Sequence, residues 1–437
     1  MSDSLAVVMG DRSAGTLTRL SGGQLRFDYD DRYRKRRGAV PLSLSMPTQI
    51  RSHADRVISP WLWGLLPDND AVLRRWARQF HASASSPFSL LATPVGEDCA
   101  GSVRFLQPDK VEDHLERTGD VTWLSEGEVA QRLKDLRVDS TAWLGRSFTG
   151  QFSLAGAQAK TALLFDDGRW GVPSGSIPTS HILKPAVAGL DDHDLNEHLC
   201  LDAARRAGLL VARTRIAHFE DESAIVVDRY DRVTVQGGLA RVHQEDLCQA
   251  MGIPPSRKYQ NEGGPGPSEI VALFRGTMSP RDADDAVWRF IDALAWNWLI
   301  GGTDAHAKNY SLLLASADVR LAPLYDVASA LPYGMHEKKL RFAMKLGGHY
   351  EVFTYRNPWP RAAKELEVDT DALIARVSAL TARAPDAFAE AASALDVQEL
   401  KRDLTPRLVD LIAERAVRCA VLLDAGAAAS SPAASGH

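Results

Sequence analysis

Cysteine is scarce in this chain of 437 residues, which contains four. They are widely spaced and include no pair at the Cys-x-x-Cys spacing of zinc and redox motifs: Cys99, Cys200, Cys248 and Cys419. Such scattered thiols argue against a disulfide framework and against a cysteine-ligated zinc site. We expect all four to be reduced thiols in the core.

Long apolar runs are also missing. No stretch of the sequence reaches the length of a transmembrane helix. The first residues, Met1-Ser2-Asp3-Ser4, do not show the basic-then-apolar pattern of an export signal. The sequence therefore predicts a cytoplasmic protein that makes no contact with a membrane.

A strong excess of positive charge is absent as well. The net charge is −5, so no global basic field would attract nucleic acid. Residues 32–37, Arg-Tyr-Arg-Lys-Arg-Arg, are a local exception, either a solvated turn or a patch that binds phosphate groups. With 45% hydrophobic and 24% charged residues, the composition is that of a globular protein, and the length suits two or three domains.

The segment between Trp298 and Asp326 carries the most informative pattern. Asp304 is followed five residues later by Asn309, and Asp326 comes after a hairpin-like stretch. Kinases use the same order: an Asp that accepts the proton of the attacking hydroxyl, an Asn on Mg²⁺, and a later Asp that holds the metal ions against the nucleotide phosphates. Oxygen ligands of this kind suit Mg²⁺, which neutralises charge on a transferring phosphoryl group. The pattern predicts phosphoryl transfer.

An ordinary structural role for the same segment stays open at this stage. Gly301-Gly302-Thr303-Asp304 follows a long apolar pattern, as a helix C-cap and turn would. The density of polar groups favours a site, because Asp304, His306, Lys308 and Asn309 stand directly before an apolar strand. A solvated loop does not need them all.

A loop of small residues lies upstream. Residues 152–165 have the sequence Phe-Ser-Leu-Ala-Gly-Ala-Gln-Ala-Lys-Thr-Ala-Leu-Leu-Phe, which leads into an apolar strand. Small side chains let backbone N–H groups approach phosphate oxygens. The loop has a single glycine where kinases usually have three, so an ordinary hairpin turn is the alternative.

A lysine and a glutamate follow this loop. Lys184 ends a strand-like run from Ser180, and Glu197 lies thirteen residues further on in a helical pattern. A strand lysine on the α- and β-phosphates, held by a helix glutamate, is the ion pair of the kinase N-lobe. Each residue alone would be interpreted as a solvated surface charge. Together with the loop and the Asp/Asn/Asp set, they complete the kinase order.

With these motifs in place, the chain resembles the HipA family, serine/threonine-kinase toxins of bacterial type II toxin–antitoxin modules. The resemblance rests on residues 153–164, 179–184, 227–232 (Val-Asp-Arg-Tyr-Asp-Arg), 244–249 (Gln-Glu-Asp-Leu-Cys-Gln), Lys258-Tyr259 with the glycine-rich 263–266, and 304–309. Weaker similarity over residues 41–45, 65–68 and 88–91 extends it to nearly the whole chain.

The resemblance implies roles for individual residues. Asp304 would be catalytic, Lys184 would anchor phosphates, and Ser153 would be the autophosphorylated serine, whose modification expels the phosphate loop and silences the enzyme. The phosphate loop would consist of Ala155, Gly156, Ala157, Gln158, Ala159 and Lys160. The hinge that meets adenine through its backbone would consist of Asp228, Arg229 and Tyr230. The other residues lining the nucleotide would be His306, Lys308, Asn309, Tyr325 and Asp326.

The resemblance also implies the metal ligands, and the sequence differs from close relatives at the hinge. Asn309 and Asp326 would hold Mg²⁺. Asp228 and Tyr230 stand where close relatives have Glu and Phe, which leaves a backbone-mediated hinge intact.

The function implied by the resemblance is a toxin kinase that uses ATP and Mg²⁺ to phosphorylate an aminoacyl-tRNA synthetase, with glutamate–tRNA ligase favoured, and so causes growth arrest and persistence. A HipB-like antitoxin, a helix-turn-helix DNA-binding protein, would neutralise it. The pair would repress their operon, with operator DNA bound chiefly through the antitoxin. A small-molecule kinase and a catalytically idle corepressor in a DNA-bound complex are the alternatives, and the intact set of Lys184, Asp304, Asn309 and Asp326 argues against an idle protein.

The expected fold is α+β, a protein-kinase-like or phosphoinositide-kinase-like fold of two lobes with a mainly antiparallel-sheet N-lobe and an all-α C-lobe. The expected parts are an N-terminal α/β subdomain over residues 1–140, the N-lobe over 141–240, the helical C-lobe over 241–425 and a disordered tail over 426–437. Hydrophobic patterns predict strands at 5–9 and 102–106, and helices at 70–80 and 284–300.

Overall fold

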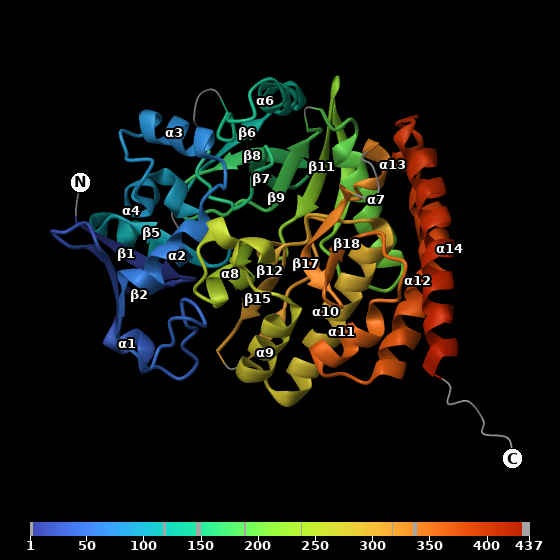
Figure 1. Ribbon diagram of the computed structural model, residues 1–437. Helices are drawn as coiled ribbons and strands as arrows, with labels where there is room; N and C mark the ends of the chain where they lie inside the picture. Colours follow the sequence, from blue (N-terminus) through green and yellow to red (C-terminus); the bar gives the residue numbers. More distant parts are fainter. Residues whose placement is uncertain are drawn as a thin grey trace, which may run out of the picture.

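The computed structural model describes residues 3–116, 119–145, 150–187, 189–236, 238–316, 318–334 and 339–430. Figure 1 shows an N-terminal unit (blue) at one side, a second sheet (green) in the middle and a largely helical part (yellow to red) at the other side. The chain therefore has the expected α+β character.

A five-stranded antiparallel sheet forms the N-terminal unit, in the order β4-β3-β2-β1-β5. Its elements are β1 (Ser4–Met9), β2 (Arg12–Arg19), β3 (Leu25–Tyr29), α1 (Asp31–Arg34), β4 (Ser52–Ala54), α2 (Asp55–Leu65), α3 (Asp70–Gln79), α4 (Pro87–Leu91) and β5 (Val103–Leu106). Strands β1 and β5 confirm the two predicted strands. Helix α3 confirms the predicted helix, and it buries Val72, Leu73 and Trp76 on one face.

A six-stranded sheet follows, in the order β10-β11-β9-β7-β8-β6, and all its pairs are antiparallel as predicted. Its elements are β6 (Val121–Leu124), α6 (Glu126–Val138), β7 (Thr161–Asp166), β8 (Arg169–Pro173), β9 (His181–Pro185), α7 (His193–Arg206), β10 (Thr214–Phe219) and β11 (Glu222–Asp228). Strand β6 pairs with β8, and α6 packs on β11. We therefore place the boundary of the N-terminal unit before Val121 instead of at residue 140.

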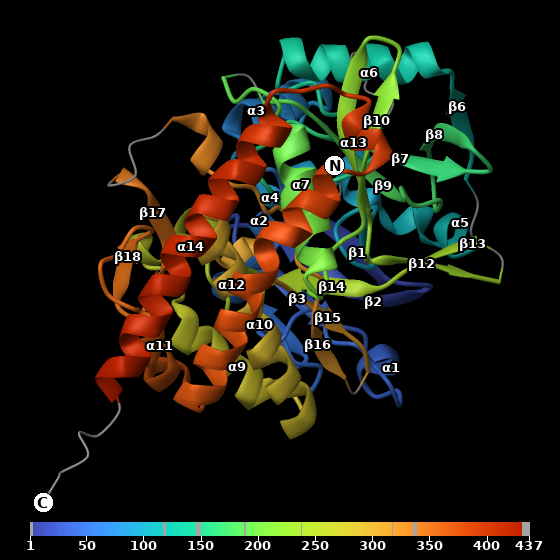
Figure 2. The same ribbon diagram turned by 90° about the vertical axis from the view of Figure 1, so that its right-hand side faces the viewer.

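The third part is mostly helical. Its main helices are α9 (Pro267–Thr277), α10 (Pro280–Ile300), α11 (Trp359–Leu366), α12 (Thr370–Ala392) and α14 (Leu404–Ser430), with α8 (Leu247–Ala250) and α13 (Leu395–Gln398) as short turns. Figure 2 shows α12 and α14 packed side by side. Helix α14 continues to Ser430, so the disordered tail predicted from residue 426 is wrong at its start, and residues 431–437 lie outside the described residues.

The prediction of an all-α C-lobe is wrong in one respect, because small antiparallel sheets accompany the helices. They are β14 (His243–Asp246) with β15 (Ser311–Leu314) and β16 (Val319–Leu321), and β17 (Arg341–Leu346) with β18 (His349–Glu351). A further pair, β12 (Arg232–Val235) with β13 (Gly238–Arg241), lies at the end of the region predicted as the N-lobe. Strand β15 begins directly after the 304–309 segment, and its ladder with β14 holds that segment at a fixed place.

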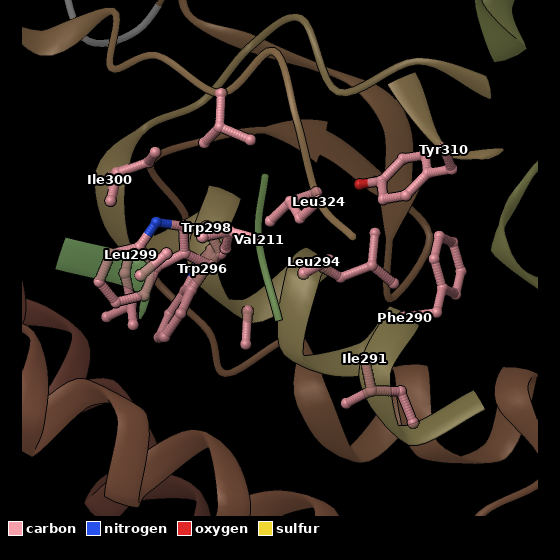
Figure 3. Close-up of a cluster of buried hydrophobic side chains, with 14 of the residues drawn as sticks. Val211, Phe290, Ile291, Leu294, Trp296, Trp298, Leu299, Ile300, Tyr310 and Leu324 are labelled. Carbon is pink, nitrogen blue, oxygen red and sulfur yellow. The ribbon is translucent and has the colours of Figure 1, made fainter. Parts of the chain in front are cut away.

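Helix α10 is the centre of the C-terminal core. It begins at Pro280, four residues earlier than predicted, because the Ser279 side chain accepts a hydrogen bond from the backbone N–H of Asp282. Figure 3 shows its aromatic and aliphatic side chains meeting residues of neighbouring segments, among them Val211 and Tyr310. Burial of each such large apolar side chain contributes about 1.5–3 kcal/mol, so this helix is firmly anchored.

The end of α10 explains the two glycines of the sequence. Gly301 is the C-cap with φ 64° and ψ 37°, a left-handed conformation that favours glycine. A Cβ on Gly302 would overlap Oδ1 of Asn297. The C-cap interpretation of this segment is therefore correct, and the cap is also what delivers Asp304 to its position.

A buried charge network joins the N-terminal unit to the second sheet. The Asp98 carboxylate is fully buried and accepts hydrogen bonds from Thr179, Arg229, Arg232 and Arg241. Burial alone would raise the pKa of Asp98, but the three guanidinium groups outweigh it and hold the pKa well below its usual range. Arg229 and Arg232, the two arginines of the 227–232 motif, therefore have a structural role.

The structure also bears on the cysteines and on membrane-spanning helices. All four cysteines are free and buried, as predicted. Within the described ranges, no helix is long and apolar enough to cross a membrane.

Candidate active site

A cavity of about 1080 Å³ lies where the three parts of the chain meet. Most of the residues selected from the sequence line it: Ala155, Gly156, Ala157, Gln158, Lys160, Lys184, Asp228, Arg229, Tyr230, Asp304, His306, Lys308, Asn309, Tyr325 and Asp326. Two selected residues, Ser153 and Ala159, are not on its wall. Segments separated by more than a hundred residues therefore converge on one site.

Lys184 on β9 lies at the centre of the ionised groups. Its Nζ donates to Oε1 of Glu197 on α7 at 2.7 Å and to Oδ1 of Asp326 at 2.7 Å. Burial alone would lower the pKa of Lys184, but the two carboxylates outweigh it and raise the pKa above its usual value. The structure thus brings together the lysine and glutamate that the sequence pairs, and adds Asp326 to them.

Asp326 has an unusual backbone conformation, with φ at 57°. Few non-glycine residues adopt this left-handed region, and such outliers concentrate at functional sites. Burial alone would raise the pKa of Asp326, but the charges of Lys184 and Lys160 hold it well below its usual range. The carboxylate is therefore ionised and aimed at the lysines.

The small-residue loop runs over the cavity before β7. Its carbonyls are tied at two points: Lys160 Nζ donates to the Ala155 oxygen at 2.7 Å, and the Asp68 N–H donates to the Gly156 oxygen at 3.0 Å. Gly156 has φ 101°, which a residue with a side chain would adopt only under strain, so the single glycine is required here. Burial, with the nearby charge of Lys184, lowers the pKa of Lys160 to about 8. A phosphate group beside this lysine would stabilise its charged form.

Ser153 and Ala159 do not line the cavity. Ser153 is fully buried, its Oγ donates to the Leu65 carbonyl at 2.9 Å, and its N–H donates to the Asp98 carbonyl at 3.0 Å. Ala159 packs against the core of the N-terminal unit. In this conformation, the Ser153 hydroxyl is not accessible from the cavity.

The opposite end of the cavity is mainly apolar and aromatic. Ile182 and Val227 lie on its wall, and the rings of Tyr230 and Tyr325 stand 5.7 Å apart. The side chain of Arg229 is engaged in the Asp98 network, so this part of the wall offers backbone groups and not that guanidinium. The geometry is compatible with a hinge that acts through its backbone.

The segment after α10 forms a compact turn around Asp304. Asn309 Nδ2 and the His306 N–H both donate to the Asp304 carbonyl, at 2.7 and 2.8 Å. The Asp304 side chain itself is 68% exposed at the mouth of the cavity, and the Tyr259 hydroxyl donates to its Oδ1 at 2.6 Å. Because the Asn309 amide nitrogen is engaged, its Oδ1 is the atom left to act as a ligand.

Sequence reasoning missed Asp68, which the N-terminal unit contributes to the site. Its carboxylate accepts from Lys258 at 2.9 Å and forms an ion pair with Lys308 of the 304–309 segment. Burial alone would raise the pKa of Asp68, but the two lysines outweigh it and lower the pKa. The only sequence signal was the weak similarity over residues 65–68, which carries no chemical pattern of its own.

The wall of the cavity fits a nucleotide with Mg²⁺. Among the described residues, four buried polar atoms of wall residues have no hydrogen-bond partner: Gln158 Nε2, His193 Nδ1, Glu197 Oε2 and His306 Nδ1. No cluster of three or more metal-ligating side chains is found in the described part of the chain. Mg²⁺ commonly takes one or two side-chain oxygens and completes its shell with phosphate and water. Asn309 and Asp326 supply such oxygens.

The sequence is similar to that of known proteins. The family model for the HipA-like C-terminal domain matches residues 152–388, and that for the HipA N-terminal domain matches residues 5–106. Y4mE of Sinorhizobium fredii, a predicted kinase, is 32% identical over 86% of this chain and 89% of its own length. The serine/threonine-protein kinase toxin HipA of Shewanella oneidensis is 27% identical over 84% of this chain and 86% of its own.

A solved structure covers nearly the whole chain. It is Shewanella oneidensis HipA in a complex with HipB and its operator DNA, with a TM-score of 0.81, 23% identity, and coverage of 96% of this chain and 98% of that one. This similarity confirms the two-lobed, kinase-like α+β fold that the sequence predicts.

Proposed function

The chain belongs to the HipA family, and on this premise we propose that it is an ATP-dependent serine/threonine-protein kinase, the toxin of a toxin–antitoxin pair. The observation that carries the kinase assignment is the convergence of Lys184, Glu197, Asp304, Asn309 and Asp326 in one cavity. A scaffold would not need this set of charges at one place.

The proposed nucleotide would lie along the cavity. Its adenine would occupy the apolar part of the wall near Ile182 and Tyr325 and meet the backbone of residues 228–230, and its phosphates would lie beside Lys184 and the loop 155–160. Asn309 and Asp326 would hold Mg²⁺, which when bound would neutralise charge on the phosphates. Lys184, held by Glu197, would contact the phosphates.

The proposed base is Asp304. A serine Oγ of the acceptor attacks the γ-phosphorus, the bond from that phosphorus to the β,γ-bridging oxygen breaks, and ADP leaves. The proton of the serine passes to the Asp304 carboxylate. The exposure of this side chain at the mouth of the cavity favours a protein acceptor over an enclosed small molecule.

The proposed biological role follows the family. The acceptor is an aminoacyl-tRNA synthetase, with glutamate–tRNA ligase favoured, and its phosphorylation in the cytoplasm stops growth and produces persistence. A HipB-like helix-turn-helix antitoxin neutralises the kinase and joins it on operator DNA. The Shewanella oneidensis HipA–HipB–operator complex supports this assembly by analogy.

Labelled ATP tests the proposal directly. The purified chain is incubated with labelled ATP, Mg²⁺ and each of the host's aminoacyl-tRNA synthetases, and the modified residue is mapped. We expect label on one serine of glutamate–tRNA ligase. Label that enters a small molecule of a metabolite extract, and no protein, would instead support a small-molecule kinase. Absence of any transfer, together with antitoxin-dependent operator binding, would support an idle corepressor.

Ser153 is the proposed site of autophosphorylation, and its modification is expected to switch the enzyme off. A phosphoserine carries about −1.5 to −2 charge at neutral pH. The buried position of Ser153 against the Leu65 carbonyl cannot accommodate such a group, so the loop that covers the phosphate end must leave. We expect the modified enzyme to bind ATP about tenfold more weakly or worse.

Intact-mass measurement and calorimetry check this switch. After incubation with ATP and Mg²⁺, wild type should gain the mass of one phosphate group and lose nucleotide affinity, while Ser153→Ala should stay unmodified and bind normally. A wild-type protein phosphorylated at Ser153 that still binds ATP with unchanged affinity would rule the switch out.

A further inference from the structure

The motif of Lys258-Tyr259 and Gly263-Gly264-Pro265-Gly266 has no role in the kinase proposed above. We propose that Tyr259 is a positioning residue that orients the carboxylate of Asp304 for catalysis, and that the glycine turn after it holds the tyrosine in place. This inference rests on the proposed function, in which Asp304 is the base.

The contact between the two side chains is direct. The Tyr259 hydroxyl donates to Oδ1 of Asp304 at 2.6 Å, whereas His306 Nε2 lies 4.0 Å from the same oxygen, too far for a hydrogen bond. Because the Asp304 side chain is 68% exposed, packing alone does not fix its orientation. The hydrogen bond occupies one carboxylate oxygen and leaves Oδ2 for the proton of the acceptor hydroxyl.

Tyr259 is itself tied to the catalytic segment. Its ring meets the His306 ring edge-on, with centroids 4.9 Å apart and an interplanar angle of 81°. The neighbouring Lys258 carbonyl accepts from the Ala307 N–H at 3.3 Å, and Lys258 Nζ forms an ion pair with Asp68 at 2.9 Å. Backbone, ring and charge contacts therefore connect residues 258–259 to the loop that carries Asp304.

The glycine turn explains the rest of the motif. The Gly264 N–H donates to the Tyr259 carbonyl at 2.9 Å, and Gly263 has φ 91°. A Cβ on Gly264 would overlap the carbonyl oxygen of Arg257 and lie 2.8 Å from that of Tyr259. Only glycine lets the chain return this closely, so the turn closes behind Tyr259 and limits its movement.

Tyr259 is the donor of this hydrogen bond. Burial and the neighbouring Asp304 raise the pKa of Tyr259 above its usual value, so the phenol remains a donor at neutral pH. Other titratable groups act on this pair or on His306: Lys258, Glu262, Asp68, Asp326 and His193. A Tyr259→Phe substitution leaves all of them in place.

Tyr259→Phe is expected to lower kcat about tenfold with the KM for ATP changed by less than about twofold, because orientation of the base matters in the transition state and not for nucleotide binding. The rates are measured with labelled ATP, Mg²⁺ and purified glutamate–tRNA ligase, or with the chain itself as acceptor.

Tyr33→Phe is the matched control, since it removes a hydroxyl that donates to the Val40 carbonyl within the N-terminal unit. It should leave kcat and the KM for ATP as in wild type. Crystal structures of wild type, Tyr259→Phe and Tyr33→Phe add a measurement that does not depend on activity. The Asp304 side chain should have one orientation in wild type and Tyr33→Phe. In Tyr259→Phe it should rotate or adopt several orientations.

The outcomes separate the two proposals. An active wild type whose Tyr259→Phe variant keeps the wild-type kcat would overturn the positioning role, and so would an unchanged Asp304 orientation in the variant crystal. A wild type that transfers no phosphoryl group to any acceptor would overturn the proposed kinase function instead, and the crystal structures would still decide the positioning role.

Discussion

Replacing Asp304 with asparagine should lower kcat by about 10²–10⁴-fold, the range that a general base contributes, and leave ATP affinity within about twofold. The amide has nearly the same shape and can still accept the Tyr259 hydrogen bond through its oxygen, but it cannot take the proton of the acceptor hydroxyl. The backbone carbonyl that holds Asn309 and His306 is unchanged by the substitution. Expression of the variant should no longer slow growth.

Asp386→Asn is a matched control for this experiment. Asp386 is 80% exposed on α12 and pairs only loosely with Arg383, at 3.9 Å. Rates of phosphoryl transfer, calorimetric ATP affinity and growth curves are compared for wild type and both variants. Toxicity or transfer at the wild-type level in Asp304→Asn would show that this carboxylate is not the base.

Asp326→Ala is expected to weaken binding of Mg²⁺ with a nucleotide by about 10–100-fold, the effect of losing one or two charge-assisted interactions. The substitution removes a proposed metal ligand and also one of the two carboxylates on Lys184, which keeps only Glu197. A ligand to the metal contributes to ground-state binding, whereas Asp304 acts on the acceptor. Asp326→Ala should therefore weaken nucleotide binding more than Asp304→Asn does.

Calorimetry with a nonhydrolysable ATP analogue, with and without Mg²⁺, measures this difference. In wild type the affinity should rise with Mg²⁺, and in Asp326→Ala that dependence should largely disappear. Asp304→Asn provides the comparison, because it should keep the wild-type response to Mg²⁺. Equal affinities of the two variants with Mg²⁺ would mean that the metal is held elsewhere.

Much of the site was predictable because its parts are short local patterns. The Asp304–Asn309 spacing lies within one turn that follows the C-cap of α10, and local hydrogen bonds set that turn. Lys184 and Glu197 are brought together by a strand and the helix that follows it. The hydrophobic patterns of α3 and α10 predicted those helices, with one cap residue, Ser279, moving the start of α10.

Other features were mispredicted because pairing partners lie far apart in the chain. Strand β6 belongs to the second sheet because it pairs with β8, which lies far from it in the sequence. The strands β14 to β16 form a small sheet in the C-lobe, for which the sequence predicted helices alone. Ala159 has the same small side chain as its neighbours in the loop, yet it packs on the N-terminal core. Composition does not distinguish such positions.

The sequence by itself determined the family, the order of the chemical groups and the helices that present them, because each depends on neighbours along the chain. Only the tertiary structure decided that Asp68 holds Lys258 and Lys308, that Tyr259 donates to Asp304, and that Ser153 is buried. These relations join residues tens to hundreds of positions apart. Their physical basis is distance in space, since hydrogen bonds and ion pairs act over a few ångströms and the chain brings such residues together only by folding.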